Sequence, residues 1–145
     1  MPGRLTSSTQ HHPSWKSGDF LSGRLLYVED NLQIAELTCM MLEEIGLEIT
    51  QASSAEEALH VSGEGEQPFD IVLTDVVMPG LSGVQLARRL NRRWPELPVV
   101  LVSGFSEELA AGYGAQFELL RKPFTRTALI DCLQRHLDGV VYQTA

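Results

Sequence analysis

Residues 70–83 read DIVLTDVVMPGLSG, and this stretch decides the fold. Its apolar run, 71–73, has no alternating polar positions, which is typical of a strand buried on both faces of a parallel sheet. The run stops at Asp75, a Pro-Gly pair turns the chain, and Ser82 can cap the helix that follows. The stretch therefore predicts a strand–turn–helix unit with a carboxylate at the carboxyl end of its strand.

The same unit repeats along the chain from about residue 24 to residue 138. Five segments are predicted as strands, namely 25–28, 47–50, 71–74, 99–102 and 116–120. Five helical patterns follow them, at 34–45, 53–61, 82–94, 106–113 and 125–137. Strands that alternate with helices pair in parallel through right-handed crossovers. The sequence therefore predicts an α/β fold, an open doubly wound parallel sheet whose ligands bind beyond the carboxyl ends of the strands.

Composition and charge exclude some classes of partner. The 145 residues include 11 basic and 19 acidic ones, and the formal charge of −8 argues against a nucleic-acid partner. No apolar stretch approaches the ~20 residues that span a membrane, and the start of the chain lacks a signal-peptide pattern, so we expect no membrane contact by this chain. Cys39 and Cys132 lie in apolar helical patterns, which indicates buried thiols in a reducing, cytoplasmic compartment.

The two ends of the chain differ from its middle. Residues 1–23 are rich in Ser, Gly and His and poor in aliphatic side chains, so we expect a flexible tail or linker there. We expect a folded domain over 24–138 and a short C-terminal tail over 139–145.

Several histidines and arginines have ordinary interpretations. The adjacent pair His11 and His12 has no third metal ligand in range, so a plain tail is the better interpretation. His60 and His136 lie in predicted helices without acidic or cysteine partners at ligand spacing, and we expect neither to bind a metal. A basic stripe beside Trp94 is interpreted as solvated helix surface, and it consists of Arg88, Arg89, Arg92 and Arg93.

The polar residues that end the strands are the candidates for a site. In a parallel sheet they meet on one rim, and they are Glu29, Asp30, Asp75, Ser103 and Lys122. Two carboxylates ~5 Å apart repel by roughly 3 kcal/mol, and one lysine leaves the group with a net charge of −2. A divalent cation would complete the neutralisation, and all-oxygen donors favour Mg²⁺ or Mn²⁺. The pattern therefore predicts phosphoryl chemistry with a carboxylate nucleophile beside a metal.

Each of these residues also has a purely structural interpretation. Asp30 followed by Gln33 fits a helix capping box, Ser103 fits a turn, and Lys122 fits a solvated charge. Taken together these interpretations are poor, because they leave an uncompensated acidic group on one rim of the sheet.

Four segments of the chain resemble the receiver domain of two-component response regulators. In the family's order and spacing they are Leu26-Tyr27-Val28-Glu29-Asp30-Asn31, 70–80 with Gly83, Val102-Ser103-Gly104 and Arg121-Lys122-Pro123-Phe124. The resemblance covers about residues 24–138 and implies a flavodoxin-like sheet with strand order 2-1-3-4-5. It also implies a sensor histidine kinase or phosphotransfer domain as partner, docking on the first and fifth helices.

The resemblance gives each rim residue a role. It makes Asp75 the phosphoacceptor, Ser103 the hydroxyl that hydrogen-bonds the phosphoryl group, and Lys122 the amine that pairs with it. The implied Mg²⁺ ligands are Glu29, Asp30, Asp75 and the backbone carbonyl of Val77. The Lys122–Pro123 bond is expected to be cis. The implied domain is regulatory and catalyses only its own phosphorylation and dephosphorylation.

One position departs from the family's pattern. Members usually carry an aromatic residue three positions before the lysine, where this chain has Leu119. Phe117 is nearby and, by strand alternation, on the same face. The usual coupling of an aromatic ring to the hydroxyl is therefore not expected, and Ser103 with the loop 104–108 becomes the candidate for passing the signal on.

Two other functions compete with a phosphoaccepting receiver. A Mg²⁺-dependent aspartyl-phosphate phosphohydrolase normally has a second Asp two residues after its nucleophile, but this chain has Val77 at that position. Such an enzyme normally has a cap domain as well. A pseudo-receiver that only docks is disfavoured by the intact Asp75, Asp30 and Lys122. With a short tail after about residue 138, we expect a receiver that is free-standing or the end of a hybrid sensor histidine kinase.

Overall fold

The computed structural model describes residues 19–104, 117–137 and 141–143. Five parallel strands form the main sheet in the order β3-β2-β4-β5-β6. Their bounds are β2 Arg24–Val28, β3 Glu48–Ala52, β4 Ile71–Asp75, β5 Val99–Ser103 and β6 Glu118–Arg121. The predicted flavodoxin-like fold and its strand order 2-1-3-4-5 are confirmed.

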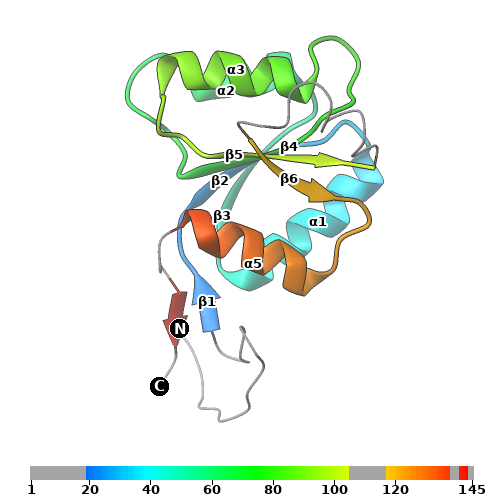
Figure 1. Cartoon of the computed structure of the whole chain (residues 1–145), viewed down its shortest axis with the longest axis vertical. Helices are drawn as coiled ribbons and strands as arrows, with labels where there is room; N and C mark the ends of the chain where they lie inside the picture. The colour runs from blue at the N-terminus through cyan, green and yellow to red at the C-terminus, as the bar shows by residue number, and fades with distance from the viewer. Residues whose placement is uncertain (1–18, 105–116, 138–140, 144–145) are drawn as a thin grey trace.

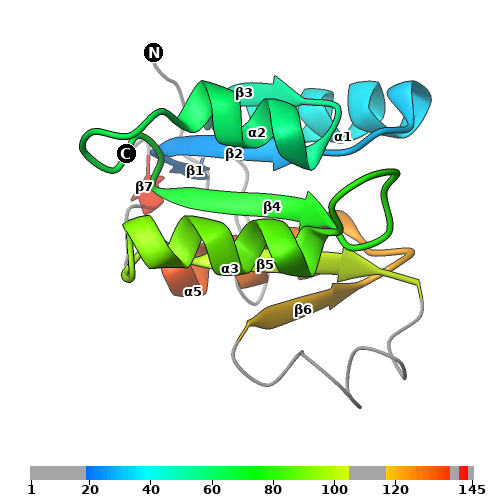
Figure 2. The same cartoon turned by 90° about the horizontal axis from the view of Figure 1, so that it is seen from above.

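Helices cover both faces of this sheet (Figures 1 and 2). On one face lie α2 (Ala55–Ser62) and α3 (Gly83–Arg93), and on the other lie α1 (Leu32–Ile45) and α5 (Arg126–His136). The helix predicted at 106–113 falls outside the described residues. The molecule is therefore a three-layer sandwich, and all five main strands point their carboxyl ends to the same edge.

The central strands are buried on both faces, as their continuous apolar runs predict. In β4, Val72 packs into the core under α2 and α3, whereas Ile71 and Leu73 pack into the core under α1 and α5. All five residues of β4 are buried. Asp75 is thus a carboxylate at the end of an otherwise apolar strand in the middle of the sheet.

The helices begin at side chains that accept hydrogen bonds from backbone N–H groups. Ser54, Ser82 and Thr125 cap α2, α3 and α5, and the role of Ser82 is the one that the sequence predicts. At α1 the cap is Asn31, whose side chain accepts from two backbone N–H groups at 3.0 Å each. The capping-box interpretation of Asp30 is therefore wrong, because the next residue takes that place.

Short segments near the two ends of the chain pair with each other. β1 (Asp19–Leu21) and β7 (Val141–Gln143) form a two-stranded antiparallel sheet, and Leu21 is buried against the core of α1 and α5. Parts of the predicted tails 1–23 and 139–145 are thus strands. Three-residue runs at opposite ends of a chain carry no local signal of a pairing. In the described part of the chain, no helix has the length and apolar character that crossing a bilayer requires.

Candidate metal centre at the carboxyl ends of the strands

The sheet brings the predicted acidic residues together. Glu29 and Asp30 directly follow β2, and Asp75 is the last residue of the neighbouring strand β4. One carboxylate oxygen from each of these three residues lies within 4.8 Å of the other two. The grouping follows from parallel pairing, because adjacent parallel strands end at the same edge.

Lys122 supplies a positive charge between two of these carboxylates. Its Nζ lies 3.4 Å from Oε1 of Glu29 and 3.4 Å from Oδ1 of Asp75. Its backbone N–H donates to the carbonyl oxygen of Ser103 at 2.9 Å, which ties the residue after β6 to the end of β5. The solvated interpretation of Lys122 is therefore wrong, since its amine contacts two buried carboxylates.

Glu29 is held in place by the chain around it. Its backbone N–H donates to the carbonyl of Ala52 at 3.1 Å, and its Oε2 accepts from the backbone N–H of Asn31 at 3.0 Å. Only 3 % of the residue is exposed. Asp30, in contrast, is exposed, and Asn31 has taken the capping role. The pair thus offers one fixed buried carboxylate and one carboxylate that faces solvent.

Asp75 sits in a tight backbone environment. Its Oδ1 accepts from the backbone N–H of Val76 at 3.1 Å, and the hydroxyl of Thr74 donates to its carbonyl oxygen at 3.0 Å. Gly83, the first residue of α3, approaches so closely that a Cβ there would lie 2.1 Å from that carbonyl oxygen. Gly83 and Thr74 therefore act as supports of the acidic residue, a role that the sequence does not indicate.

The electrostatics of the group favour a cation. Burial, and then the charge of Glu29, raise the pKa of Asp75 from 3.8 to about 6, although Lys122 and the N–H of Val76 act in the opposite direction. The proton of Asp75 is thus partly retained near pH 6. A positive charge added beside the group would release that proton and remove the repulsion.

The donor set fits Mg²⁺. Three carboxylates and one amine carry a net charge of −2, which one divalent cation neutralises, and all three acidic donors are oxygens. Val77 lies two residues beyond Asp75, and 61 % of this residue is exposed. A metal contact from its backbone carbonyl stays a prediction.

The structure also places the residues of the predicted signalling path. Ser103 is the last residue of β5 and is 2 % exposed. Phe117 and Leu119 pack into the same core cluster, under α2 and α3, so their predicted common face is confirmed. Most of the loop 104–108 falls outside the described residues.

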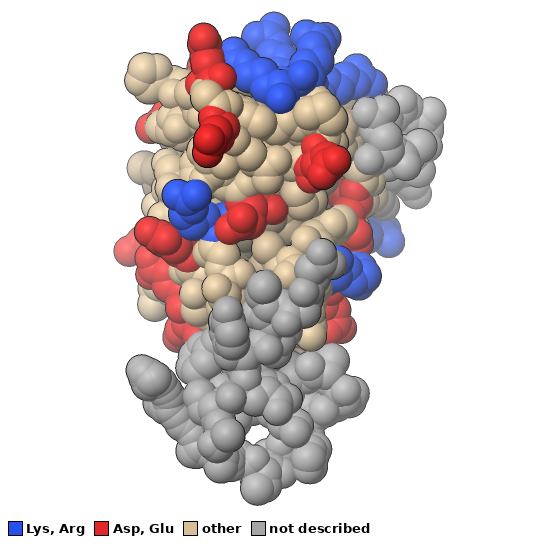
Figure 3. Space-filling view, turned by 90° about the vertical axis from the view of Figure 1, so that its left-hand side faces the viewer, with Lys and Arg blue, Asp and Glu red and all other residues tan. Residues whose placement is uncertain are grey.

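The arginine stripe on α3 lies at the surface. All four of its arginines are exposed, and Figure 3 shows basic side chains gathered at the end of the molecule where α3 lies. Arg93 donates to the carbonyl of Gly63 at 2.6 Å and lies over the ring of Trp94 at 5.9 Å. The solvated interpretation fits this stripe, with Arg93 also tying α3 to the segment after α2.

A second group of potential metal ligands was missed by the sequence analysis. Ligand atoms of Glu118, Cys132 and His136 lie within 4.8 Å of one another. The expectation that His136 lacks such partners is therefore wrong. Cys132 precedes it by one helical turn, a spacing visible in the sequence, whereas Glu118 arrives from β6 through tertiary packing.

Comparison with known proteins places the chain among signalling domains. The profile described as "Response regulator receiver domain" matches residues 25–134. The response regulator FleR of Pseudomonas aeruginosa is 34 % identical over 122 residues, which cover 82 % of this chain and 25 % of that protein. The sensor kinase CckA of Brucella abortus is 32 % identical over 81 % of this chain and 13 % of that protein. The receiver protein CpdR of Brucella abortus is 30 % identical over 79 % of this chain and 96 % of its own length.

Solved structures of response regulators are also similar to this chain. A response regulator receiver domain from Clostridium thermocellum superposes with a TM-score of 0.71 at 32 % identity, covering 79 % of this chain and 94 % of that one. The response regulator TrrA of Thermotoga maritima, solved in complex with Mg²⁺–BeF, has a TM-score of 0.71 at 30 % identity, covering 79 % and 98 %. This chain thus spans a quarter or less of FleR and CckA and nearly all of CpdR and TrrA.

Proposed function

The chain belongs to the response regulator receiver domain family, and from that premise we propose that Asp75 is its phosphoacceptor in a two-component phosphorelay. The observation that carries this proposal is the setting of Asp75. It ends the central strand, buried, with the Lys122 amine 3.4 Å away and two further carboxylates within 4.8 Å. The domain itself is proposed to cover residues 24–138. The family is regulatory, so phosphorylation is the signal and not a metabolic product.

The contacts of Asp75 indicate different roles for its two carboxylate oxygens. Oδ1 accepts from the N–H of Val76 and pairs with Lys122, so Oδ2 is the oxygen that attacks phosphorus. The new bond joins Oδ2 to phosphorus, the bond from phosphorus to the imidazole nitrogen of a phosphohistidine breaks, and that nitrogen keeps the electron pair. Lys122 and the hydroxyl of Ser103 then hold the oxygens of the phosphoryl group. This is catalysis by positioning and charge.

Mg²⁺ is the proposed cofactor, held by Glu29, Asp30 and Asp75 with the carbonyl of Val77. When bound, it supplies positive charge to the carboxylates and to the oxygens of the transferred group. The oxygen-only donor set and the raised pKa of Asp75 support this assignment. The solved complex of TrrA with Mg²⁺–BeF supports it further, because that relative shares the fold over nearly its whole length.

The proposed partner is a histidine kinase or a phosphotransfer domain, docked on α1. This helix begins two residues after Asp30 and carries an exposed apolar face, in which Leu32 is 73 %, Leu37 68 % and Met40 54 % exposed. An apolar face beside the acidic site suits a partner that must bring a phosphohistidine to Asp75. Both a free-standing receiver and a segment of a sensor kinase remain compatible with the lengths of CpdR and CckA.

The test is phosphorylation with acetyl phosphate, followed by intact-protein mass spectrometry. With Mg²⁺ we expect one phosphoryl group per chain, and none after chelation with EDTA. Asp75→Asn should carry no label, whereas Asp131→Asn, a matched change on α5, should label like the parent chain. Label on Asp75→Asn would overturn the assignment. Steady release of phosphate from small phosphomonoesters would favour the phosphohydrolase instead.

A further inference from the structure

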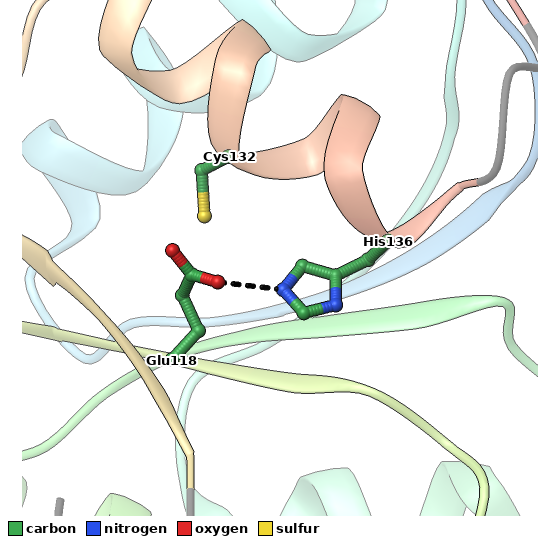
Figure 4. A group of neighbouring side chains, drawn as sticks. All are labelled: Glu118, Cys132 and His136. Carbon is green, nitrogen blue, oxygen red and sulfur yellow. Dashed lines mark hydrogen bonds and ion pairs between the residues drawn. The ribbon is translucent and has the colours of Figure 1, made fainter.

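Three potential metal ligands converge between β6 and α5 (Figure 4). Glu118 is the first residue of β6, and Cys132 and His136 lie one turn apart near the end of α5. Their ligand atoms lie within 4.8 Å of one another, and Nε2 of His136 is 2.9 Å from Oε1 of Glu118. Four residues of extended chain, roughly 13 Å, separate Glu118 from Lys122. The group is therefore distinct from the acidic site.

We propose that Glu118, Cys132 and His136 bind one Zn²⁺ ion or a similar transition-metal dication, with water as the fourth ligand. A thiolate, an imidazole and a carboxylate are the three side-chain donors that zinc accepts in proteins, and tetrahedral coordination is its usual geometry. Mg²⁺ prefers oxygen donors alone, so this mixed set selects against the ion proposed for Asp75. Three protein ligands and a water make an open zinc site.

One pair of donors is already close to its separation in a zinc site. Two donors about 2.0–2.1 Å from a tetrahedral Zn²⁺ lie about 3.3 Å apart. The nitrogen of His136 and the oxygen of Glu118 are 2.9 Å apart, so this pair needs to separate by only a few tenths of an ångström, while the sulfur of Cys132 lies within 4.8 Å of both. Cys132 and His136 occupy positions i and i+4 of one helix, where side chains share a face. The helix therefore presents sulfur and nitrogen together to the carboxylate.

A charged neighbour orients one of the three ligands. Arg135 pairs with Oε2 of Glu118 and leaves Oε1 facing His136, so one oxygen is oriented while the other is offered to the ion. With the guanidinium of Arg135 counted, the thiolate of Cys132 and the carboxylate of Glu118 give a net charge of −1 before Zn²⁺ binds and +1 afterwards. Zinc binds cysteine as the thiolate, so binding releases the thiol proton of Cys132 to the buffer.

An entry route for the ion is present. The side chains of Glu118 and His136 are 25 % and 27 % exposed. His136 also lines a cavity of about 390 Å³ at the amino-terminal edge of the sheet, the edge that faces the viewer in Figure 3. Asp70 and Glu96 line the same cavity and add negative charge. Water and a cation can thus reach the imidazole from solvent.

The alternative is a plain hydrogen-bond network around Glu118, and Co²⁺ spectroscopy separates the two. The full-length chain is reduced, freed of metal with a chelator and titrated with Co²⁺ while Mg²⁺ is kept saturating. The parent for this test is His11→Gln/His12→Gln, because that pair could bind cobalt weakly. We expect one Co²⁺ per chain, with the thiolate charge-transfer band and the visible bands of tetrahedral cobalt, and displacement by Zn²⁺.

Single variants locate the ligands. Cys132→Ser should lose the thiolate band, and His136→Gln should weaken Co²⁺ and Zn²⁺ binding at least tenfold. Cys39→Ser, which changes the other free thiol, on α1, should keep the band and the affinity. If Cys132→Ser does not fold, His136→Gln carries the test, because its side chain is partly exposed.

Three results would overturn the site. They are the absence of a thiolate band in the parent, an unchanged affinity in His136→Gln, and loss of the band in Cys39→Ser. A hydrogen-bond network alone gives the first of these. None of the readouts involves Asp75, so the outcome is independent of the proposed phosphoacceptor.

Discussion

At Gly83 a single methyl group would disturb the acidic site. A Cβ there would lie 2.1 Å from the carbonyl oxygen of Asp75 and 3.0 Å from Cα of Val76, and both are backbone atoms. Relief requires that α3 or the end of β4 move. We expect Gly83→Ala to lower the free energy of unfolding by about 2–3 kcal/mol, measured by urea titration, and to slow labelling of Asp75 by acetyl phosphate.

The control for this change is Gly65→Ala. No atom lies within 4 Å of a Cβ built at Gly65. Its substitution should therefore alter the free energy of unfolding by less than about 0.5 kcal/mol and leave labelling unchanged. Equal losses in the two variants would show that the effect comes from glycine in general and not from contact with Asp75.

Residue types at strand ends could be predicted to meet, but their orientations could not. Glu29, Asp75 and Lys122 converge because parallel strands end together, which follows from the apolar runs alone. Whether Asp30 or Asn31 caps the next helix depends on backbone angles at the cap, and both residue types suit that place. The support by Gly83 and Thr74 depends on how α3 is placed on β4, which no local pattern records.

At the scale of one element, two adjacent residues at the start of α1 are expected to have different roles, one in stability and one in metal binding. Asn31 accepts two backbone hydrogen bonds of α1, and Asp30 accepts none among the described bonds. We expect Asn31→Ala to lower the free energy of unfolding by about 1 kcal/mol, measured in EDTA, with a small effect on Mg²⁺ affinity. Asp30→Ala should have a small effect on the free energy of unfolding and should weaken Mg²⁺ binding at least tenfold in a calorimetric titration. A loss of Mg²⁺ affinity in Asn31→Ala as large as in Asp30→Ala would contradict this division.

The elements differ in how well they could be predicted from the sequence. Strands β2, β4 and β5 are mostly continuous apolar runs, and β3 and β6 are shorter or alternating patterns, yet all five lie within a few residues of their predicted places. The β1–β7 pair rests on three-residue segments from opposite ends of the chain, and only tertiary contact reveals it. The group of Glu118, Cys132 and His136 could be predicted only in part. Cys132 and His136 have a readable spacing, but Glu118 joins them only because β6 packs on α5.

Across the whole molecule, stability should depend on pH through the acidic site. In the metal-free protein the pKa of Asp75 is about 6, above its ordinary value of 3.8. The folded state therefore binds this proton more tightly than the unfolded state, and stability falls as pH rises from about 4 to about 6. Asp75→Asn removes the charge that causes the fall. The variant should thus be more stable than the parent at pH 7 by about 1–2 kcal/mol after allowance for solvent screening, with no difference below about pH 4.

Urea unfolding in EDTA at pH 4 to 8 measures this difference, with Asp131→Asn as the control whose curve should follow the parent. Saturating Mg²⁺ should reverse the order at pH 7, because an ion that binds only the folded parent stabilises it by mass action. The reversal separates repulsion in the acidic site from a general benefit of asparagine at position 75. A variant that stays more stable in Mg²⁺, or a difference that does not change between pH 4 and pH 7, would contradict the placement of Asp75 among charges that need a cation.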